Sequence, residues 1–224
     1  QFLYALDSPG AERGLGLVVA RQAGLLIWML TNATRMTPAF VSLLTEIPIA
    51  HVFISIYGAT VSTYESMTGV TGSFAQFLHG LDTLKTCPFP VTVRMPVTTI
   101  NWTEVDACQD LVETRGFKFQ YSFDIHPRTD GGPTPLSYRL PPDRKAELDL
   151  RKLGAASPDV TPDTCIASEP FISCACGCSR FAVTPYGEMN LCVAFPTPQY
   201  DLRTGTLREG WAILKETVDQ AQPT

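Results

Sequence analysis

Phe117-Lys118-Phe119-Gln120-Tyr121-Ser122-Phe123-Asp124 alternates aromatic and polar residues without a break. Successive side chains of a β-strand point to opposite faces, so this stretch predicts a strand with one apolar face and one polar face. Val91 to Val97 and His51 to Tyr57 show the same alternation, with Arg94 and Ser55 in their polar sets. We therefore expect a sheet whose two faces differ in character.

Helix-like segments separate these strand-like ones. Pro38 to Glu46 is one, and Ser73 to Thr86 places Phe74, Phe77 and Leu81 on one helical face. Asn101 is expected to cap the next helix, with Glu104 three residues on as its reciprocal partner. Strands joined by helical crossovers form parallel, right-handed βα units.

The polar face needs its own explanation, because helices normally cover both faces of a parallel sheet and make both apolar. The sequence favours an α/β fold in which helices cover the apolar face and the polar face lines an open, hydrated cavity. Such an incomplete barrel would bind ligands at the carboxyl ends of its strands. The alternative is an antiparallel or edge sheet with one face in solvent.

Composition limits the range of partners and surroundings. The chain has 224 residues, is 45% hydrophobic and 17% charged, and carries a net charge of -5. It lacks the basic surface that attracts nucleic acid. No apolar run approaches the ~20 residues of a membrane helix, and the chain begins without the cationic segment of a secretory signal. We expect a cytoplasmic protein that binds neither nucleic acid nor membrane.

The amino-acid composition of the chain changes after Asp124. Residues 126–142 are rich in proline, Asp143 to Leu153 is a short charged helix, and a second proline-rich connector runs from Ser157 to Pro170. We expect a domain boundary there, with a partial barrel over residues 1–156 and a cysteine-rich extension over residues 157–224.

The extension contains four of the seven cysteines, namely Cys174, Cys176, Cys178 and Cys192. Pro185-Tyr186-Gly187 predicts a turn between two apolar runs, and the resulting hairpin would carry Cys192 back towards the other three. Closely spaced thiolates suit a soft metal or an iron–sulfur cluster, although a disulfide or unligated thiols are the alternative. Beyond them, a helix from Arg208 to about Gln220 carries an apolar stripe: Leu207, Trp211, Leu214 and Val218.

These pieces together resemble the radical S-adenosylmethionine (SAM) superfamily with a C-terminal SPASM or twitch-type extension, a group that contains many peptide maturases. The matching motifs run in family order. They are Thr31-Asn32, Phe53 to Gly58, Tyr64, Thr68-Gly69, Gly72-Ser73-Phe74, Val97 to Asn101, Pro127 to Gly131, and the extension's pattern of Cys174, twelve residues, Gly187, four residues and Cys192.

The resemblance implies a partial parallel (βα) barrel that lacks its first strand and a chemistry based on SAM. In this family an iron–sulfur cluster held by a Cys-x3-Cys-x2-Cys motif reduces SAM to a 5'-deoxyadenosyl radical, which abstracts a hydrogen atom from the substrate. The C-terminal extension of the family holds auxiliary 4Fe-4S clusters. The 224 residues contain no Cys-x3-Cys-x2-Cys. The family's Gly-Gly-Glu segment is replaced by Ala5-Leu6-Asp7. We therefore expect a fragment or a degenerate member, with an incomplete extension.

The resemblance also assigns residues. It makes Asp7 a candidate for the amino group of SAM, Ser55 for its ribose and Asn101 for the loop beside the cofactor. Arg94, on the polar face, is a candidate for the carboxylate of SAM or of a substrate, with an ion pair to Asp124 as the alternative. Asn101 as a simple cap and Ser55 as a local backbone partner remain open. Cys174 and Cys192 are favoured as cluster ligands, followed by Cys176 and Cys178.

The expected function is that of a radical SAM maturase or oxidoreductase that modifies a peptide or small molecule and draws on an electron donor. The alternative is a non-catalytic peptide-binding module with a structural zinc or cluster. A zinc-bearing α/β enzyme unrelated to SAM is a third possibility.

Overall fold

The computed structural model describes residues 2–5, 17–18, 21–22, 24, 26–47, 49–128, 130–153, 180–184, 186–192, 195 and 197–220. The chain divides into two compact units: Gln1–Ile125 with Leu136–Glu147, and His126–Pro135 with Leu148–Thr224. The domain boundary expected near residue 157 falls outside the described residues. None of the described helices combines the length and apolar character needed to cross a lipid bilayer.

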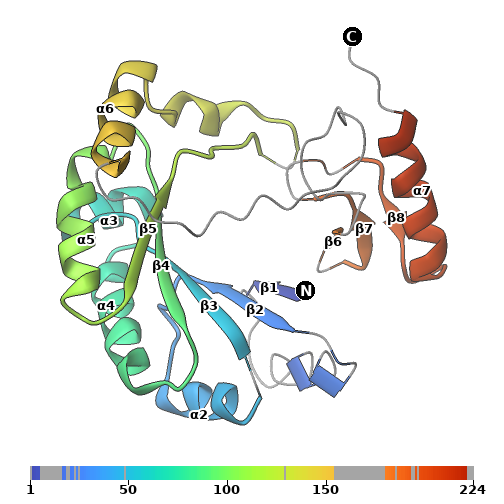
Figure 1. The fold of residues 1–224 in the computed structure, drawn as a ribbon, viewed down its shortest axis with the longest axis horizontal. Helices are drawn as coiled ribbons and strands as arrows, with labels where there is room; N and C mark the ends of the chain where they lie inside the picture. Colours follow the sequence, from blue (N-terminus) through green and yellow to red (C-terminus); the bar gives the residue numbers. More distant parts are fainter. Residues whose placement is uncertain are drawn as a thin grey trace. The chain divides into compact units, whose positions relative to one another are not determined.

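The first unit is built on a five-stranded sheet whose order in space is the order in sequence (Figure 1). Every neighbouring pair of strands is parallel, which confirms the α/β expectation and shows that the antiparallel alternative is wrong. The strands are β1 (Phe2–Ala5), β2 (Ile27–Thr31), β3 (Ile49–Ser55), β4 (Val91–Pro96) and β5 (Lys118–Ser122).

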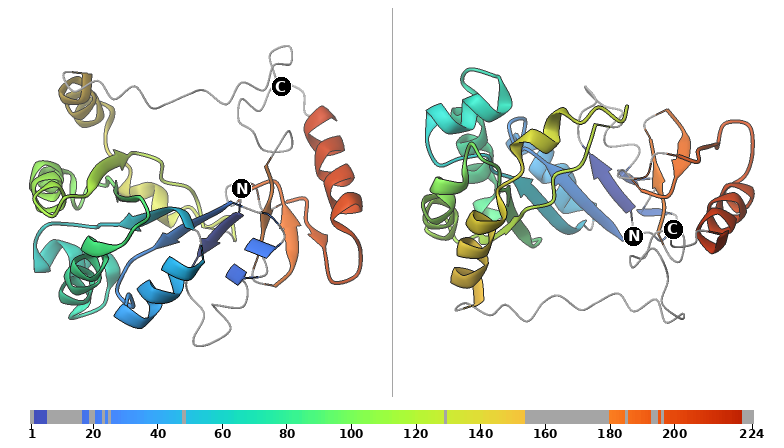
Figure 2. Two further views of the ribbon diagram at one scale, coloured as in Figure 1. Left: turned by 60° about the horizontal axis from the view of Figure 1, so that its bottom comes forward. Right: turned by 90° about the horizontal axis from the view of Figure 1, so that it is seen from above.

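Helices cover one face of this sheet, as both figures of the ribbon show (Figures 1 and 2). They are α2 (Pro38–Glu46), α3 (Val61–Thr68), α4 (Ser73–Thr83) with the 3-10 turn η1 (Leu84–Thr86), and α5 (Val105–Glu113), which the 3-10 turn η2 (Trp102–Glu104) precedes. A third 3-10 segment, η3 (Thr134–Tyr138), and helix α6 (Pro142–Leu153) follow β5 in the sequence.

The core of the unit lies between the sheet and these helices. Val52, Ile54 and Ile56 of the predicted apolar set are fully buried, as are Val93 and Met95 of the next strand. Burying an aliphatic side chain of this size contributes roughly 1.5–3 kcal/mol relative to leaving it exposed. The helices supply the opposing side chains: Leu44, Tyr64, Phe77, Leu81, Cys108 and Val112.

The second unit contains the predicted hairpin. Strands β6 (Ala182–Val183) and β7 (Glu188–Asn190) are antiparallel, and β8 (Tyr200–Asp201) completes a three-stranded sheet. Gly187 adopts a φ of 83°, a left-handed conformation that glycine accepts at little cost, and its N–H donates to the carbonyl of Thr184 (3.0 Å). The hairpin expected from the Pro185-Tyr186-Gly187 turn is therefore confirmed.

Helix α7 (Leu207–Gln220) docks on this small sheet. Leu214 packs with Met189 and Leu191, with Trp211 and Val218 beside them. Most of the predicted stripe is thus confirmed, but Leu207 at the first position of the helix is 52% exposed and lies outside the packed core.

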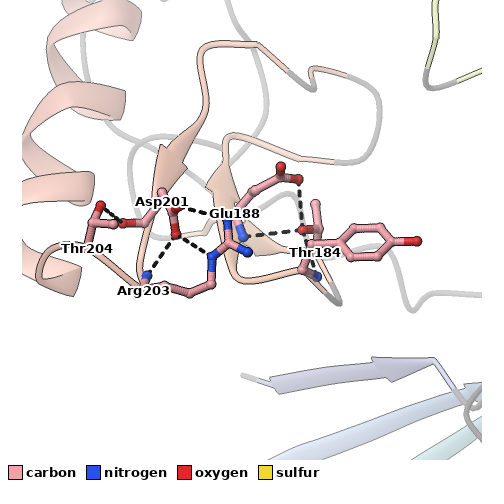
Figure 3. A network of polar contacts seen from close by, with 6 residues as sticks. Thr184, Glu188, Asp201, Arg203 and Thr204 are labelled. Carbon is pink, nitrogen blue, oxygen red and sulfur yellow. Dashed lines mark hydrogen bonds and ion pairs between the residues drawn. The ribbon is translucent and has the colours of Figure 1, made fainter.

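An ion pair braces the turn that follows β8 (Figure 3). The Arg203 guanidinium donates to both carboxylate oxygens of Asp201, each over 2.8 Å. These side-chain hydrogen bonds, with one from the backbone N–H of Arg203, lower the pKa of Asp201 to about 2. The Arg203 side chain is largely in solvent and that of Asp201 is partly exposed, so the pair orients the turn more than it stabilises the fold.

Candidate functional site

The polar face of the sheet brings two predicted site residues side by side, one at the carboxyl end of its strand and one two residues before that end. Ser55 is the last residue of β3 and pairs in register with Arg94 of β4. Arg94 pairs in turn with Gln120 of β5. Ser55, Arg94 and Gln120 therefore form one row across three adjacent parallel strands, and we call them the polar row.

Arg94 is held by its neighbours on this face. Its guanidinium carbon lies 3.5 Å from the centroid of the Phe53 ring, and its Nε donates to Oε1 of Gln120 over 3.1 Å. The expected alternative of an ion pair with Asp124 is wrong, because the side chain is bound to Gln120 instead. Desolvation lowers the pKa of Arg94, but a guanidinium remains charged at neutral pH. Its terminal N–H groups have no hydrogen-bond partner among the described residues and can take a carboxylate bidentately.

An aromatic group lies on the same face. His51 stacks on Phe53 with 4.3 Å between ring centroids, and Trp28 lies 5.6 Å from Phe53. Nε2 of His51 and Oγ1 of Thr92 are 2.8 Å apart. Burial, followed by the positive charges of Arg94 and Lys118, lowers the pKa of His51, so the ring is neutral at pH 7. Sequence reasoning gave His51 and Gln120 no role, although both belong to the polar sets that the alternation defined.

Ser55 differs from Arg94 in having no fixed partner. It is half-buried, and its hydroxyl makes no hydrogen bond to any described residue. The alternative in which Ser55 satisfies a neighbouring backbone group therefore finds no support in the described contacts.

Asn101 lies near the ends of the same strands but does a different job from the one expected. The capping prediction is wrong, because Asn101 makes no side-chain hydrogen bond to the helix that follows it. Its Nδ2 instead donates to the carbonyls of Tyr57 and Pro96, each over 3.0 Å. Its Oδ1 accepts from the N–H (2.8 Å) and hydroxyl (3.1 Å) of Thr98.

The Asn101 side chain therefore joins the segment after β3 to the segment after β4. It is fully buried, and both of its amide hydrogens are used. Asn101 positions the loops that end the strands, and its amide has no free donor for a cofactor.

Glu104, expected to return a hydrogen bond to the cap, reaches the loop after β3 instead. Its carboxylate accepts from the N–H groups of Ala59 (2.7 Å) and Thr60 (3.2 Å) and from the hydroxyls of Thr60 and Thr63. Desolvation alone would raise the pKa of Glu104, but these hydrogen bonds together lower it. The carboxylate is thus a second tie between the loop after β3 and the start of α5.

The remaining predicted site residues are mostly outside the described part of the chain. Asp7, Cys174, Cys176 and Cys178 fall there, so their roles stay predictions. Cys192 is described, half-buried and free of a disulfide. Among the described residues no three His, Cys, Asp or Glu side chains lie close enough together to hold a metal ion.

The other described cysteines, Cys87 and Cys108, are not disulfide-bonded. Cys108 is buried on α5, and desolvation, with Glu104 adding to it, raises its pKa to about 12. Desolvation also raises the pKa of Cys87, which is half-buried. Neither thiol is activated for nucleophilic chemistry or metal binding.

Comparison with known proteins gives the class of fold. No protein-family model matches the chain. The structure of Streptococcus suis SuiB bound to the precursor peptide SuiA superposes on 94% of this chain with a TM-score of 0.69 and 11% sequence identity. SuiB bound to S-adenosylmethionine gives a TM-score of 0.62 at 12% identity, again over 94% of the chain. The fold is that of a partial radical SAM barrel with a small antiparallel sheet and a C-terminal helix.

A relative is also detectable in sequence. Over 109 residues, or 49% of its length, the chain is 28% identical to the AdoMet-dependent heme synthase of Methanosarcina barkeri. The resemblance to the radical SAM superfamily that the motifs predicted is thereby confirmed. The chain spans 31% of the heme synthase and 53% of SuiB.

Proposed function

We propose that this chain provides the SAM-binding face of a radical SAM enzyme that modifies a peptide or a small molecule. The observation that carries the proposal is the polar row: Ser55 is the last residue of β3, and Arg94 and Gln120 lie in register with it, each two residues before the carboxyl-terminal edge of its parallel strand. Ligands of open parallel sheets bind at that edge. The heme synthase relative is AdoMet-dependent by name, and SuiB has been crystallised with SAM.

The described residues offer SAM the groups it needs. Its carboxylate can pair with the terminal N–H groups of Arg94, whose plane is fixed by Phe53 and Gln120. Its ribose hydroxyls can bond with the free hydroxyl of Ser55. Asp7 is proposed for its amino group on the resemblance alone. Asn101 and Glu104 hold the surrounding loops in place, so the binding edge is organised before the cofactor arrives.

The reaction class rests on the superfamily resemblance. Bound SAM with a reducing cluster supplies a carbon-centred radical that abstracts hydrogen from a substrate. This chain contributes residues that bind and orient; its aromatic group at Trp28, His51 and Phe53 provides an apolar surface against which a substrate can pack. The auxiliary 4Fe-4S cluster, proposed at Cys174 and Cys192 with Cys176 and Cys178, rests on the cysteine spacing. An electron donor is the corresponding partner.

SAM binding by the full chain tests the proposal. Equilibrium dialysis with radiolabelled SAM is expected to show saturable binding that Arg94→Gln weakens at least about tenfold, because a hydrogen bond to a charged group contributes roughly 1.5–3 kcal/mol. Arg94→Lys should recover only part of the loss, since an ammonium lacks the planar fork. Arg208→Gln, at an exposed position on α7, is the matched control. Equal binding by the wild type and Arg94→Gln would refute the assignment.

A non-catalytic peptide-binding module remains the second candidate. SuiB was crystallised with a precursor peptide, and the half-buried rings of Trp28 and His51 beside the buried Phe53 could pack against an extended peptide. Peptide binding without any SAM binding by the full chain would favour this candidate. Peptide binding that strengthens when SAM is present would favour the enzyme.

A further inference from the structure

A cavity of about 340 Å³ lies in the first unit at the end of β2. The β2–α2 turn, α3 and α4 form its walls, and we call it the turn pocket, defined by Asn32, Arg35, Tyr64, Thr68, Ser73 and Gln76. None of the residues of the polar row lines it. Its volume is within the range of small-molecule sites. Nothing in the proposed SAM site accounts for it.

The turn that forms one wall is held in an unusual conformation. Ala33 has a φ of 60°, a left-handed value that is uncommon for residues with a side chain, and it is fully buried. The hydroxyl of Thr31 accepts a hydrogen bond from the Ala33 N–H over 3.1 Å. The turn lies so close to α4 that a Cβ added at Gly80 would stand 2.0 Å from the Ala33 carbonyl oxygen. The wall is therefore preformed.

The opposite wall is equally fixed. Thr68 at the end of α3 and Ser73 at the start of α4 share a hydrogen bond of 2.8 Å between their hydroxyls. The carboxylate of Glu65 accepts from the Gly72 N–H over 2.7 Å. These contacts join the end of α3 to the start of α4, and Thr68 and Ser73 both line the pocket.

The described lining of the pocket carries positive charge and no negative charge. Among the described residues that line it, Arg35 is the one charged side chain, and no carboxylate lines it. Arg35 is exposed and has no ion pair with any described residue. A guanidinium in a lining of hydroxyl and amide residues that includes no acid suits an anion.

Tyr64 gives the second, independent indication. Its side chain is fully buried in the pocket wall, and its hydroxyl has no hydrogen-bond partner among the described residues. The rings of Tyr57, Phe74 and Phe77, with centroids 5.1–5.5 Å away, hold the Tyr64 ring in place. Burial raises the pKa of this hydroxyl, so it stays protonated and is a donor. A buried donor without an acceptor costs free energy that a bound acceptor would recover.

We propose that the turn pocket binds a small organic anion, with its carboxylate or phosphate at Arg35 and a further oxygen as the acceptor for the Tyr64 hydroxyl. The polar lining and the preformed walls give the site its selectivity for a small, charged molecule. The proposal is independent of SAM binding at the polar row, because the two sites share no residue.

Titration of the full chain with benzoate, phenyl phosphate and neutral benzamide tests the proposal. Amide chemical shifts of residues 31–36 and 68–76 are expected to move saturably with one or both anions, and at least tenfold more weakly with benzamide. The stronger anion identifies the source as carboxylate or phosphate. Arg35→Gln should remove the preference for the anion, whereas Arg21→Gln, at an exposed position outside the pocket, should keep it. Equal binding of benzamide, or shifts confined to other residues, would overturn the proposal.

Tyr64→Phe separates a role in binding from a role in folding. The hydroxyl has no partner to lose in the free protein, so the melting temperature should stay the same or rise, while affinity for the preferred anion falls several-fold. A clear drop in the melting temperature would mean that the hydroxyl is already satisfied, which would contradict its assignment as the vacant donor.

Discussion

At the scale of single residues, two side chains tie the carboxyl ends of the strands together. Asn101 links the segments after β3 and β4, and Glu104 links the loop after β3 to α5. The sequence correctly placed both residues at the start of a helix. It could not show their hydrogen-bond partners, because Tyr57 and Ala59 lie more than forty positions earlier in the chain. Capping patterns describe only hydrogen bonds between residues a few positions apart.

Asn101→Ala should destabilise the first unit by about 2–4 kcal/mol, because it leaves two partly buried carbonyls and the buried Thr98 N–H without their partner. Asn101→Asp should also be costly, since a carboxylate cannot donate to those carbonyls. Urea unfolding followed by circular dichroism measures the loss. Gln109→Ala, which removes an exposed side chain from α5, is the control and should change stability by less than about 0.5 kcal/mol.

Glu104 predicts a dependence of stability on pH. The pKa of Glu104 is lower in the folded protein than in the unfolded chain, where it is about 4.5. The unfolded state therefore takes up a proton first as the pH falls. The stabilisation that Glu104 provides is fully present only above the pKa of the unfolded chain. Stability should therefore decline as the pH falls from about 5 through 4.5 and below. The difference between wild type and Glu104→Gln, about 1–3 kcal/mol at pH 7, should shrink over that window. Glu113→Gln is the control; a difference that does not vary with pH would contradict the assignment.

At the scale of elements, the packing of α4 on the β2–α2 turn depends on the absence of a side chain at Gly80. The apolar face of this helix was predictable from Phe74, Phe77 and Leu81, which are all buried. The close approach was not, because the left-handed Ala33 that meets Gly80 has no signature in the sequence.

Gly80→Ala tests this contact through the sign of its effect. At an open position inside a helix this change would add about 1 kcal/mol of stability through helix propensity. Here the new Cβ would stand 2.0 Å from the carbonyl oxygen of Ala33, so we expect a loss instead. Thermal unfolding measures the sign, with His79→Ala, at the neighbouring exposed position, as the control. A rise in the melting temperature would show that α4 and the turn are further apart than the structure places them.

At the scale of the whole molecule, the parallel pairing was predictable from the helical connectors, and the two-sided character of β3, β4 and β5 was predictable from the alternation within each of these strands. The hairpin was predictable from the Pro185-Tyr186-Gly187 turn, and α7 was predictable from its apolar stripe. The polar row was only half predictable: Ser55 and Arg94 were named separately, but their alignment with Gln120 depends on the register between strands, which no single strand reveals.

The central claim is that SAM binds at the polar row, and a crystal structure of the full chain grown with SAM tests it most directly. We expect the carboxylate of SAM within hydrogen-bond distance of the Arg94 guanidinium and its ribose beside Ser55. SAM bound anywhere else on the chain, with the terminal N–H groups of Arg94 left without it, would contradict the account.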